Sequence, residues 1–315
     1  MSPFRKTGEP MISVVIPSYN RRDGMLALLG DLQQQEGIAF EIIVVDDGSP
    51  DDSVEAIRRE FPGVKVLVNT RNSGPAVTRN RGIREAKGEL IVGFDSDVTI
   101  PDPLLLAKVE ARFTVSGVAG LALHILKADG KSEDVDRWWH PLPIAGFADR
   151  SFLTTYFSGT AYAFRKDAVA AAGLYPELLY MHYEEVELAW RVLDDGGEIL
   201  YCPDLVAVHH ANPVSRRNQV EVFLKPRNQI LLAASCLPLV DALGYVLPRT
   251  GYQFIRACSG GHLRDFLSAM GSAVKLFPRQ WSLRRPLRRE TLGLIRERRN
   301  PDNASFFSSF RRKAN

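Results

Sequence analysis

Residues 90–97 read Leu90-Ile91-Val92-Gly93-Phe94-Asp95-Ser96-Asp97, a short apolar run that ends in two acids. Such a run is typical of a strand that is buried on both faces of a sheet. Similar runs precede it at residues 12–17, 41–45 and 64–68, and helical patterns separate them at residues 22–35, 51–59 and 75–87. This alternation predicts an α/β fold with a mostly parallel sheet flanked by helices.

Polar residues follow three of these strands directly. They are Pro17-Ser18-Tyr19-Asn20, Asp46-Asp47-Gly48-Ser49 and Asp95-Ser96-Asp97. Ligands of parallel sheets bind at the carboxyl ends of the strands. Carboxylates that crowd together there repel one another unless a cation or hydrogen-bond donors compensate, and hard oxygen ligands suit Mg²⁺ or Mn²⁺. The alternative is simple turn chemistry, since Asp, Ser and Gly are common turn residues.

Two further residues lie near the start of the helix at 75–87. Gly74 precedes this helix and Arg79 lies in its second turn. A helix N-terminus attracts anions, and Arg pairs well with phosphate. The alternative for Arg79 is a solvated helix face.

The second half of the chain contributes acids, tryptophans and histidines. Glu184, Glu185 and Glu187 begin an amphipathic helix, where one of them is a candidate general base and where acids also favour a helix N-terminus. The polar loop 127–150 contains Trp138 and Trp139, which could cover a ligand or serve as packing anchors. The neighbouring His209 and His210 end a strand and point to opposite sides, so at most one joins a common site.

Composition indicates an ordinary soluble globular chain. It has 315 residues, 45% hydrophobic and 24% charged, and three widely spaced cysteines that form no disulfide framework. The N-terminus lacks the apolar core of a secretory signal, and the most apolar stretch, residues 230–247, is interrupted by Pro238 and Asp241. We therefore expect a cytoplasmic protein.

The net charge of +3 is unevenly distributed. Residues 279–315 hold eleven Arg and Lys against three acids, a net charge of +8, which leaves −5 for the rest of the chain. Apolar helical segments precede this basic region. The combination predicts peripheral contact of residues 279–313 with an anionic membrane surface, and a solvated helix pair is the alternative.

In their order and spacing, these segments resemble the family 2 glycosyltransferases, which have the GT-A fold. The resemblance also rests on residues 72–76 and 78–83, and on Tyr183-Glu184-Glu185-Val186-Glu187-Leu188, which looks like an acidic motif that is usually Glu-Asp-Val-Asp. Residues 203–209 look like the strand that ends in the family's metal-binding His. The 183–188 and His209 segments are similar to rhamnosyltransferase-like members that assemble bacterial cell-surface glycans.

The resemblance implies a GT-A domain over residues 1–215, with a nucleotide-sugar half at 10–100 and an acceptor half at 101–215. A basic helical extension would occupy 216–315. It implies inverting transfer of a sugar from a UDP-, GDP- or dTDP-sugar to a hydroxyl of a glycan or lipid-linked acceptor, in cell-surface polysaccharide or glycolipid assembly. The implied cofactor is Mn²⁺ or Mg²⁺.

The resemblance also implies roles for single residues. Contacts to the nucleotide-sugar are expected at Pro17, Tyr19, Asn20, Asp46, Asp47, Gly74, Arg79, Asp95 and Ser96. Metal ligands are expected at Asp97, Asp95 and His209, and acceptor-side contacts at Glu184, Glu187, Trp138 and Trp139. Glu185 would be the catalytic base in a position where the family usually has Asp. The base could instead be Glu184, or the chain could be a non-catalytic nucleotide-sugar-binding homologue.

Two other classes of protein fit less well. A nicotinamide-binding domain would carry Gly-x-Gly-x-x-Gly after its first strand, where this chain has Pro17-Ser18-Tyr19-Asn20. A nucleic-acid binder would use the basic tail, but that tail has few interleaved aromatics, and the strand-end carboxylates would repel phosphate. We expect no nucleic acid partner.

Overall fold

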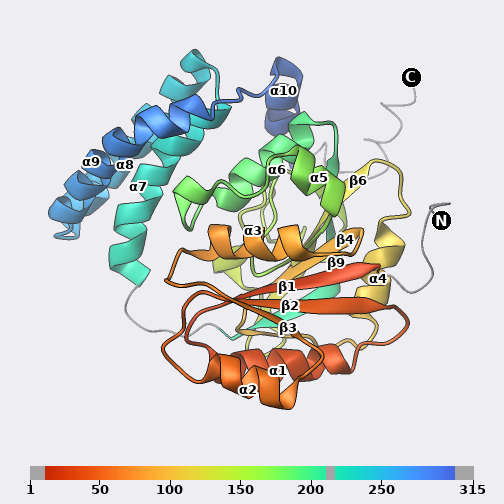
Figure 1. The fold of residues 1–315 in the computed structure, drawn as a ribbon. Coiled ribbons are helices and arrows are strands. Elements are labelled where there is room, and N and C mark those ends of the chain that lie inside the picture. The colour runs from red at the N-terminus through yellow and green to blue at the C-terminus, as the bar shows by residue number, and fades with distance from the viewer. Residues whose placement is uncertain (1–10, 211–216, 302–315) are drawn as a thin grey trace.

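The computed structural model of the protein describes residues 11–210 and 217–301 (Figure 1). Its strands are β1 (Ile12–Ser18), β2 (Phe40–Asp46), β3 (Lys65–Val68), β4 (Leu90–Phe94), β5 (Val98–Thr99), β6 (Val118–Lys127), β7 (Phe152–Thr154), β8 (Ala161–Arg165) and β9 (Glu198–His209). Its helices are α1 (Arg22–Gln33), α2 (Ser53–Glu60), α3 (Pro75–Glu85), α4 (Leu105–Arg112), α5 (Lys166–Ala171), α6 (Glu184–Asp194), α7 (Arg217–Cys236), α8 (Leu239–Ser259), α9 (Leu263–Ser282) and α10 (Arg289–Glu297).

The strands form one sheet in the order β3-β2-β1-β4-β8-β6-β9-β5, with β7 also paired to β9. β1 to β4 are mutually parallel, as the sequence predicts. The second half is mixed, because β8 runs antiparallel between β4 and β6. The start of β8 therefore meets the carboxyl end of β4, where the N–H of Asp95 donates to the carbonyl of Thr160 at 3.0 Å. This edge brings segments from both halves of the chain together.

The sheet has an apolar core on each face because side chains alternate along a strand. Val14 and Ile16 of β1 pack with α1, α2 and α4, and the intervening Val15 packs in the cluster that contains α3, α6 and α7. Figure 1 shows α1 and α2 below the strands, and α3 and α6 above them. The predicted covering of both faces by helices is confirmed.

One expectation about the strands is wrong. Residues 198–201 and 205–210 were predicted as two strands, and they form the single strand β9. Pro203 lacks the N–H that a regular ladder needs, and the pairing with β6 shifts register at Leu123 and His124. A bulge of this kind lets a strand continue past a proline.

The C-terminal helices are present as predicted, and they are joined to the rest of the fold by a common core. Leu232 and Cys236 of α7 and Leu292 and Ile295 of α10 belong to the same apolar cluster as α3 and α6. Arg298, which follows α10, forms a buried ion pair with Glu198 of β9. Within the described residues, no helix is long and apolar enough to cross a membrane.

Candidate functional site

A cavity of about 680 Å³ opens at the carboxyl edge of the parallel strands. One side of it, the strand-end wall, consists of Pro17, Ser18, Tyr19, Arg21, Asp47, Asn72, Gly74, Pro75, Thr78, Arg79, Asp95, Ser96 and Asp97. The opposite side, the loop wall, consists of residues 135–139 and 158–160 together with Tyr156, Tyr180, Met181, His182, Glu184 and Glu185. Glu221 and Lys225 of α7 complete the rim. The cavity therefore lies where strand ends predict a ligand site, and the C-terminal helices reach it.

Twelve of the predicted site residues line this cavity. They are Pro17, Tyr19, Asp47, Gly74, Arg79, Asp95, Ser96, Asp97, Trp138, Trp139, Glu184 and Glu185. His209 is buried directly behind Asp97, since its Nε2 lies 3.6 Å from Asp97 Oδ1. The neighbouring His210 is exposed and contacts Thr99, as the alternation along the strand predicts.

Three predicted contact residues lie outside the cavity lining, which corrects their assignment. Asp46 turns into its own strand end, where Oδ1 accepts the N–H groups of Gly48 and Ser49 at 3.1 and 2.9 Å. Asn20 follows β1 with a φ of 54°, and its backbone N–H donates to Ser49 Oγ at 2.8 Å. The side chain of Asp46 thus performs the turn chemistry that was the alternative interpretation.

Glu187 is the third correction. Two residues along a helix turn by about 200°, so Glu187 and Glu185 project to opposite sides of α6. Glu187 is buried against α7. It pairs with Arg191 of its own helix and accepts a hydrogen bond from Ser235 Oγ of α7 at 3.0 Å. Glu187 therefore links α6 to α7.

Asp47 shapes the strand-end wall. Its two carboxylate oxygens accept the backbone N–H groups of Ser73 and Gly74 at 2.8–3.0 Å, and Oδ1 also accepts from Asn69 Nδ2 at 2.7 Å. Gly74 has a φ of 91°, and a Cβ there would lie 2.4 Å from the ring of Tyr180. Asp47 therefore fixes the loop on which Gly74 meets the loop wall.

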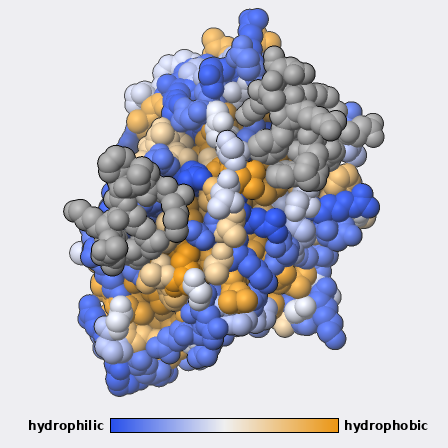
Figure 2. Space-filling model, turned by 90° about the vertical axis from the view of Figure 1, so that its right-hand side faces the viewer, coloured by the Kyte–Doolittle hydropathy of each residue, from blue (hydrophilic) through white to orange (hydrophobic). Residues whose placement is uncertain are grey.

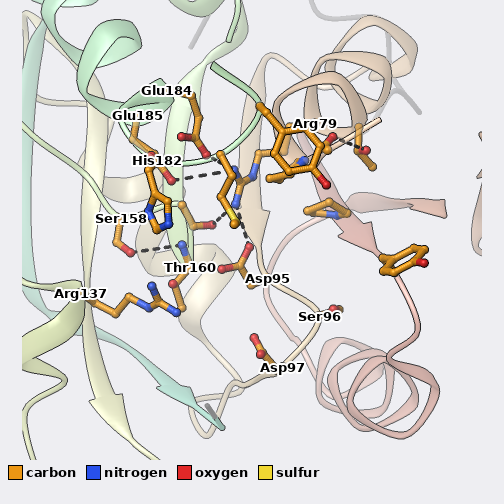
Figure 3. A pocket seen from close by; sticks show the side chains of 18 of the residues that line it. Arg79, Asp95, Ser96, Asp97, Arg137, Ser158, Thr160, His182, Glu184 and Glu185 are labelled. Atoms are coloured by element: carbon orange, nitrogen blue, oxygen red, sulfur yellow. Dashed lines mark hydrogen bonds and ion pairs between the residues drawn. The ribbon is translucent and has the colours of Figure 1, made fainter. Parts of the chain in front are cut away.

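Arg79 is buried at the centre of an acidic cluster (Figure 3). Its guanidinium lies 2.8 Å from Asp95, 3.4 Å from Glu184 and 3.9 Å from Glu185. Burial alone would lower the pKa of Arg79, and the carboxylate of Asp95 raises it overall. A buried cation with three acids around it holds those acids in place, so the solvated-face alternative for Arg79 is wrong.

The two adjacent glutamates differ in their surroundings. Glu184 is fully buried, and burial together with the charge of Glu185 raises its pKa well above the ordinary value. Glu185 keeps 15% of its side chain exposed and faces the cavity. Gly159 makes room for it, because a Cβ there would lie 2.5 Å from Glu185 Oε1 and 2.6 Å from Arg79 Nη2. Glu185 is the accessible carboxylate of the pair.

A second polar group lies at the far side of the cavity from Glu185. His209 Nδ1 lies 2.7 Å from Asp134 Oδ2, and both side chains are buried. Burial alone would raise the pKa of Asp134, but its hydrogen bond from His209 lowers it, so the carboxylate accepts and the Nδ1 carries the proton. His209 Nε2 lies 3.6 Å from Asp97 Oδ1 and 3.4 Å from Arg137 Nη2.

Asp97 and His209 are suitable as two ligands of one cation. Burial and, after it, the carboxylate of Asp95 raise the pKa of Asp97, whereas His209, Arg21 and Arg137 lower it. Asp95 Oδ1 pairs with Arg79, and the described residues contain no group of three acids, histidines or cysteines around one point, so a ligand role for Asp95 stays a prediction. Mg²⁺ and Mn²⁺ commonly take one or two protein ligands and complete their shell with substrate phosphates and water.

The two tryptophans of the loop wall have different surroundings. Trp138 packs against His140, Phe152 and Tyr201, and its Nε1 donates to the carbonyl of Leu142 at 2.7 Å. It is largely a packing anchor. Trp139 stacks on Tyr156 at the cavity, with the ammonium of Lys225 5.7 Å from its ring centre. Trp139 and Tyr156 together offer an aromatic surface.

The family model described as "Glycosyl transferase family 2" matches residues 13–172, about half of the chain, and covers the strand ends that form this cavity. The chain belongs to glycosyl transferase family 2. Among curated relatives of this family 2 chain, the dolichol-phosphate mannosyltransferase of Pyrococcus furiosus is 33% identical over 34% of this chain and 32% of its own. The chain spans less than half the length of the first curated relatives that it matches.

Solved structures of glycosyltransferases share the fold. The mannosyltransferase PcManGT from Pyrobaculum calidifontis, solved in complex with GDP-Man and Mn²⁺, is 19% identical and has a TM-score of 0.56 over 93% of this chain and 85% of its own. S. aureus TarS 1–349, in complex with UDP-GlcNAc, is 18% identical with a TM-score of 0.61 over 87% of this chain and 83% of its own. At these identities the likeness establishes the GT-A type fold alone, and the predicted fold class is confirmed.

Several residues that line the cavity were not predicted from the sequence. Arg21 lies 3.7 Å from Asp97 Oδ2, and Arg137 reaches His209 from the polar loop. Arg21 directly follows the first strand end, which is a signal that could have found it. Arg137 offered no such signal, because its position depends on how a long loop folds back over the sheet.

The segment before α6 was also missed. Tyr180, His182 and Tyr183 all have positive φ, at 65°, 68° and 72°, which is uncommon for bulky residues and collects at functional sites. Asn228 of α7 holds this segment, because its Nδ2 lies within 2.9 Å of the carbonyls of Leu179, Met181 and His182. The C-terminal helices thus position one wall of the site.

Proposed function

We propose that this chain transfers a sugar from a nucleotide diphosphate sugar to an acceptor hydroxyl, with inversion at the anomeric carbon. The observation that carries the proposal is the separation of two chemistries within one cavity. Glu185 offers one accessible carboxylate on the loop wall, and Asp97 with His209 offers a cation site on the strand-end side. A transferase needs both a base for the acceptor and charge stabilisation for the diphosphate leaving group.

The residues present fit a divalent cation, Mn²⁺ or Mg²⁺, held by Asp97 Oδ1 and His209 Nε2. When bound, such an ion neutralises the diphosphate and stabilises it as leaving group. Asp134 keeps the proton of His209 on Nδ1, which leaves Nε2 available. Arg21 and Arg137, one on each side of Asp97, would pair with the phosphate oxygens.

Glu185 would accept the proton of the attacking hydroxyl. Glu184, whose raised pKa favours the protonated form, is less suited to accept a proton, whereas Glu185 faces the cavity beside Arg79. A hydroxyl that is held at Glu185 and attacks from the side opposite the diphosphate inverts the configuration in one displacement. This arrangement favours Glu185 over Glu184 as the base.

The acceptor would lie against the loop wall. The stacked pair of Trp139 and Tyr156 suits the apolar face of a sugar ring. The Pyrococcus furiosus relative is named for dolichol phosphate, and a Pseudomonas savastanoi relative for undecaprenyl phosphate. We therefore favour a lipid-linked or cell-surface glycan acceptor.

The test is turnover with a panel of UDP-, GDP- and dTDP-sugars, each with Mn²⁺, followed by NMR assignment of the anomeric configuration of the product. We expect release of one class of nucleoside diphosphate and an inverted product. Replacing Glu185 by Gln should lower kcat by about 10²- to 10⁴-fold and leave donor binding unchanged. The matched variant Glu184→Gln should lose far less, because Glu184 favours its protonated form.

Donor binding without turnover in the wild type would support the non-catalytic alternative. A larger loss in Glu184→Gln than in Glu185→Gln would reassign the base. A product with retained configuration would contradict the single displacement.

A further inference from the structure

The exposed apolar side chains of this protein are concentrated in its C-terminal helices. Seventeen large apolar side chains are exposed among the described residues, and thirteen of them fall within residues 239–283. These residues form α8 and α9, which lie at the edge of the molecule away from the central sheet (Figure 1). Extended exposed apolar surface on a protein marks an interaction site.

The exposed residues follow the period of a helix. On α8 they include Val240, Leu243, Leu247 and Ile255, whose exposed fractions run from 60 to 83%. On α9 they include Leu263, Leu267, Val274 and Trp281, at 39 to 74%. Each set falls on one side of its helix, as in an amphipathic helix whose apolar side faces outward. We call these two stripes together the α8–α9 surface.

Cations flank the α8–α9 surface. Arg256 of α8 and Arg264, Lys275 and Arg279 of α9 are exposed. The acids on these two helices, Asp241 and Asp265, are paired with Arg296 and His262. Both helices therefore combine an outward apolar stripe with an excess of positive charge.

Part of the basic region predicted to contact a membrane is paired within the protein. Arg285, Arg288, Arg296 and Arg298 pair with Asp195, Asp194, Asp241 and Glu198, and Arg284 donates to the carbonyls of Ala234 and Leu237. Of these, Arg298 is buried, whereas the side chains of Arg288 and Arg296 are 60% and 68% exposed. Arg311, Arg312 and Lys313 lie outside the described residues. Membrane contact through residues 279–313 stays a prediction.

The face on the other side of the molecule differs from the α8–α9 surface. Figure 2 shows hydrophilic side chains along its edges with apolar residues interspersed. The exposed large apolar residues outside the α8–α9 surface and Leu283 are Tyr19 and Val135, which line the cavity, and Val68 and Leu104. A few exposed apolar residues of this kind are normal on a protein surface.

We propose that the α8–α9 surface lies on an anionic lipid membrane. Apolar stripes with Trp and flanking Arg and Lys are the composition of helices that lie in the headgroup region of a bilayer. A second copy of this chain fits less well, because two copies of a positively charged surface repel each other, whereas anionic headgroups complement it. The helices lie on the bilayer, since no described helix can span it.

The α8–α9 surface is connected to the cavity through α7. Arg256 and Ala257 of α8 line a hollow of about 330 Å³ together with Glu221 and Lys225, and the latter two also line the cavity. A lipid-linked acceptor in the membrane would thus arrive beside the loop wall. This consequence rests on the proposed function, whereas membrane binding itself does not.

The experiment is flotation of the full chain with vesicles of phosphatidylcholine alone and with phosphatidylglycerol added, without any sugar donor. We expect binding to the anionic vesicles that weakens with salt. The double variant Leu243→Ser/Leu247→Ser should bind at least about tenfold more weakly. In the triple variant Arg264→Ala/Lys275→Ala/Arg279→Ala, the affinity for anionic vesicles should fall about fivefold for each cation removed. Its affinity for vesicles of phosphatidylcholine alone should not change.

Val68→Ser/Leu104→Ser is the matched control, since it removes two exposed apolar residues from the body and should bind as the wild type does. All replaced residues are exposed, and an unchanged thermal midpoint confirms folding. Wild type that binds neither kind of vesicle would overturn the proposal. So would light scattering that shows a dimer dissociated by Leu243→Ser/Leu247→Ser, because the surface would then cover a second copy.

Discussion

The strand-end wall and the loop wall face the same cavity but are built differently. The strand-end wall follows regular parallel strands, and its residues lie within the first hundred of the chain. The loop wall depends on positive φ at Tyr180, His182 and Tyr183 and on Asn228 from a helix more than forty residues away. One wall is set by local sequence and the other by distant contacts, so damage to each should have different consequences.

The largest effect is expected at the anchor of the loop wall. Asn228→Ala removes the side-chain donor of the Met181 and His182 carbonyls, whereas the Leu179 carbonyl keeps Arg227, and the expected cost is about 3 kcal/mol in the free energy of unfolding. Urea denaturation measures this cost. The comparison variant Asn69→Ala, beside the strand-end wall, removes the hydrogen bonds to Asp47 and from Arg81, but both partners keep other contacts, so it should cost about 1 kcal/mol. Equal losses of unfolding free energy in the two variants would contradict the claim that the loop wall depends more on distant contacts than the strand-end wall does.

Gly159→Ala tests the junction of the two walls. A Cβ at this position meets both Glu185 and Arg79, so the carboxylate must shift by a large fraction of an ångström. We expect kcat to fall by about 10²-fold with a small change in thermal midpoint. Gly30→Ala is the control, since a Cβ there meets nothing within 4 Å. Unchanged kcat in Gly159→Ala would argue against Glu185 as the base.

Gly74→Ala should disturb the contact between the two walls, which Gly74 and Tyr180 form. The alanine would hold an unfavourable φ of 91° and collide with the ring of Tyr180, at a cost of about 1–3 kcal/mol. Because Asp47 holds the Gly74 N–H, donor affinity should fall as well. Thermal melts measure the loss of stability, and titration with the donor measures the loss of affinity. A variant with wild-type affinity and stability would show that the two walls are independent.

Acidification should lower the free energy of unfolding through His182 of the loop wall. Burial, with a smaller contribution from Lys225, lowers the pKa of His182 to about 4. Between the ordinary value near 6.5 and about 4, the unfolded chain takes up a proton that the folded chain does not. Stability is therefore lost as the pH falls through this window, by up to about 3 kcal/mol. His182→Gln should show a flatter dependence of the thermal midpoint on pH, and an identical slope would contradict this.

The two walls also differ in how far sequence predicts them. Asp95, Asp97 and Asp47 were predicted because strand ends of a parallel sheet meet at one edge, and Arg79 because it lies near the start of a helix. Asp46 and Asn20 lie outside the cavity lining, since pattern alone does not distinguish a residue of the turn from one that faces a ligand. Asp134 and Arg137 were missed because a loop without periodicity positions them.

The helices after residue 216 are also predicted only in part from the sequence. Their amphipathic pattern predicts helices, and α7 to α10 are present. The pattern does not reveal that their arginines pair with Asp194, Asp195 and Glu198 of the preceding domain. The amphipathic pattern also does not show which apolar stripe is exposed, because that depends on how the helices pack against one another.

The central claim is a metal-dependent nucleotide-sugar site at Asp97. Its most direct test is the thermal midpoint of wild type and Asp97→Ala with UDP-, GDP- and dTDP-sugars, each with and without Mn²⁺. A ligand that binds the folded state raises the midpoint by mass action. We predict a Mn²⁺-dependent rise with one nucleotide class in the wild type and none in folded Asp97→Ala. No rise with any donor, or an equal rise in both proteins, would contradict the claim.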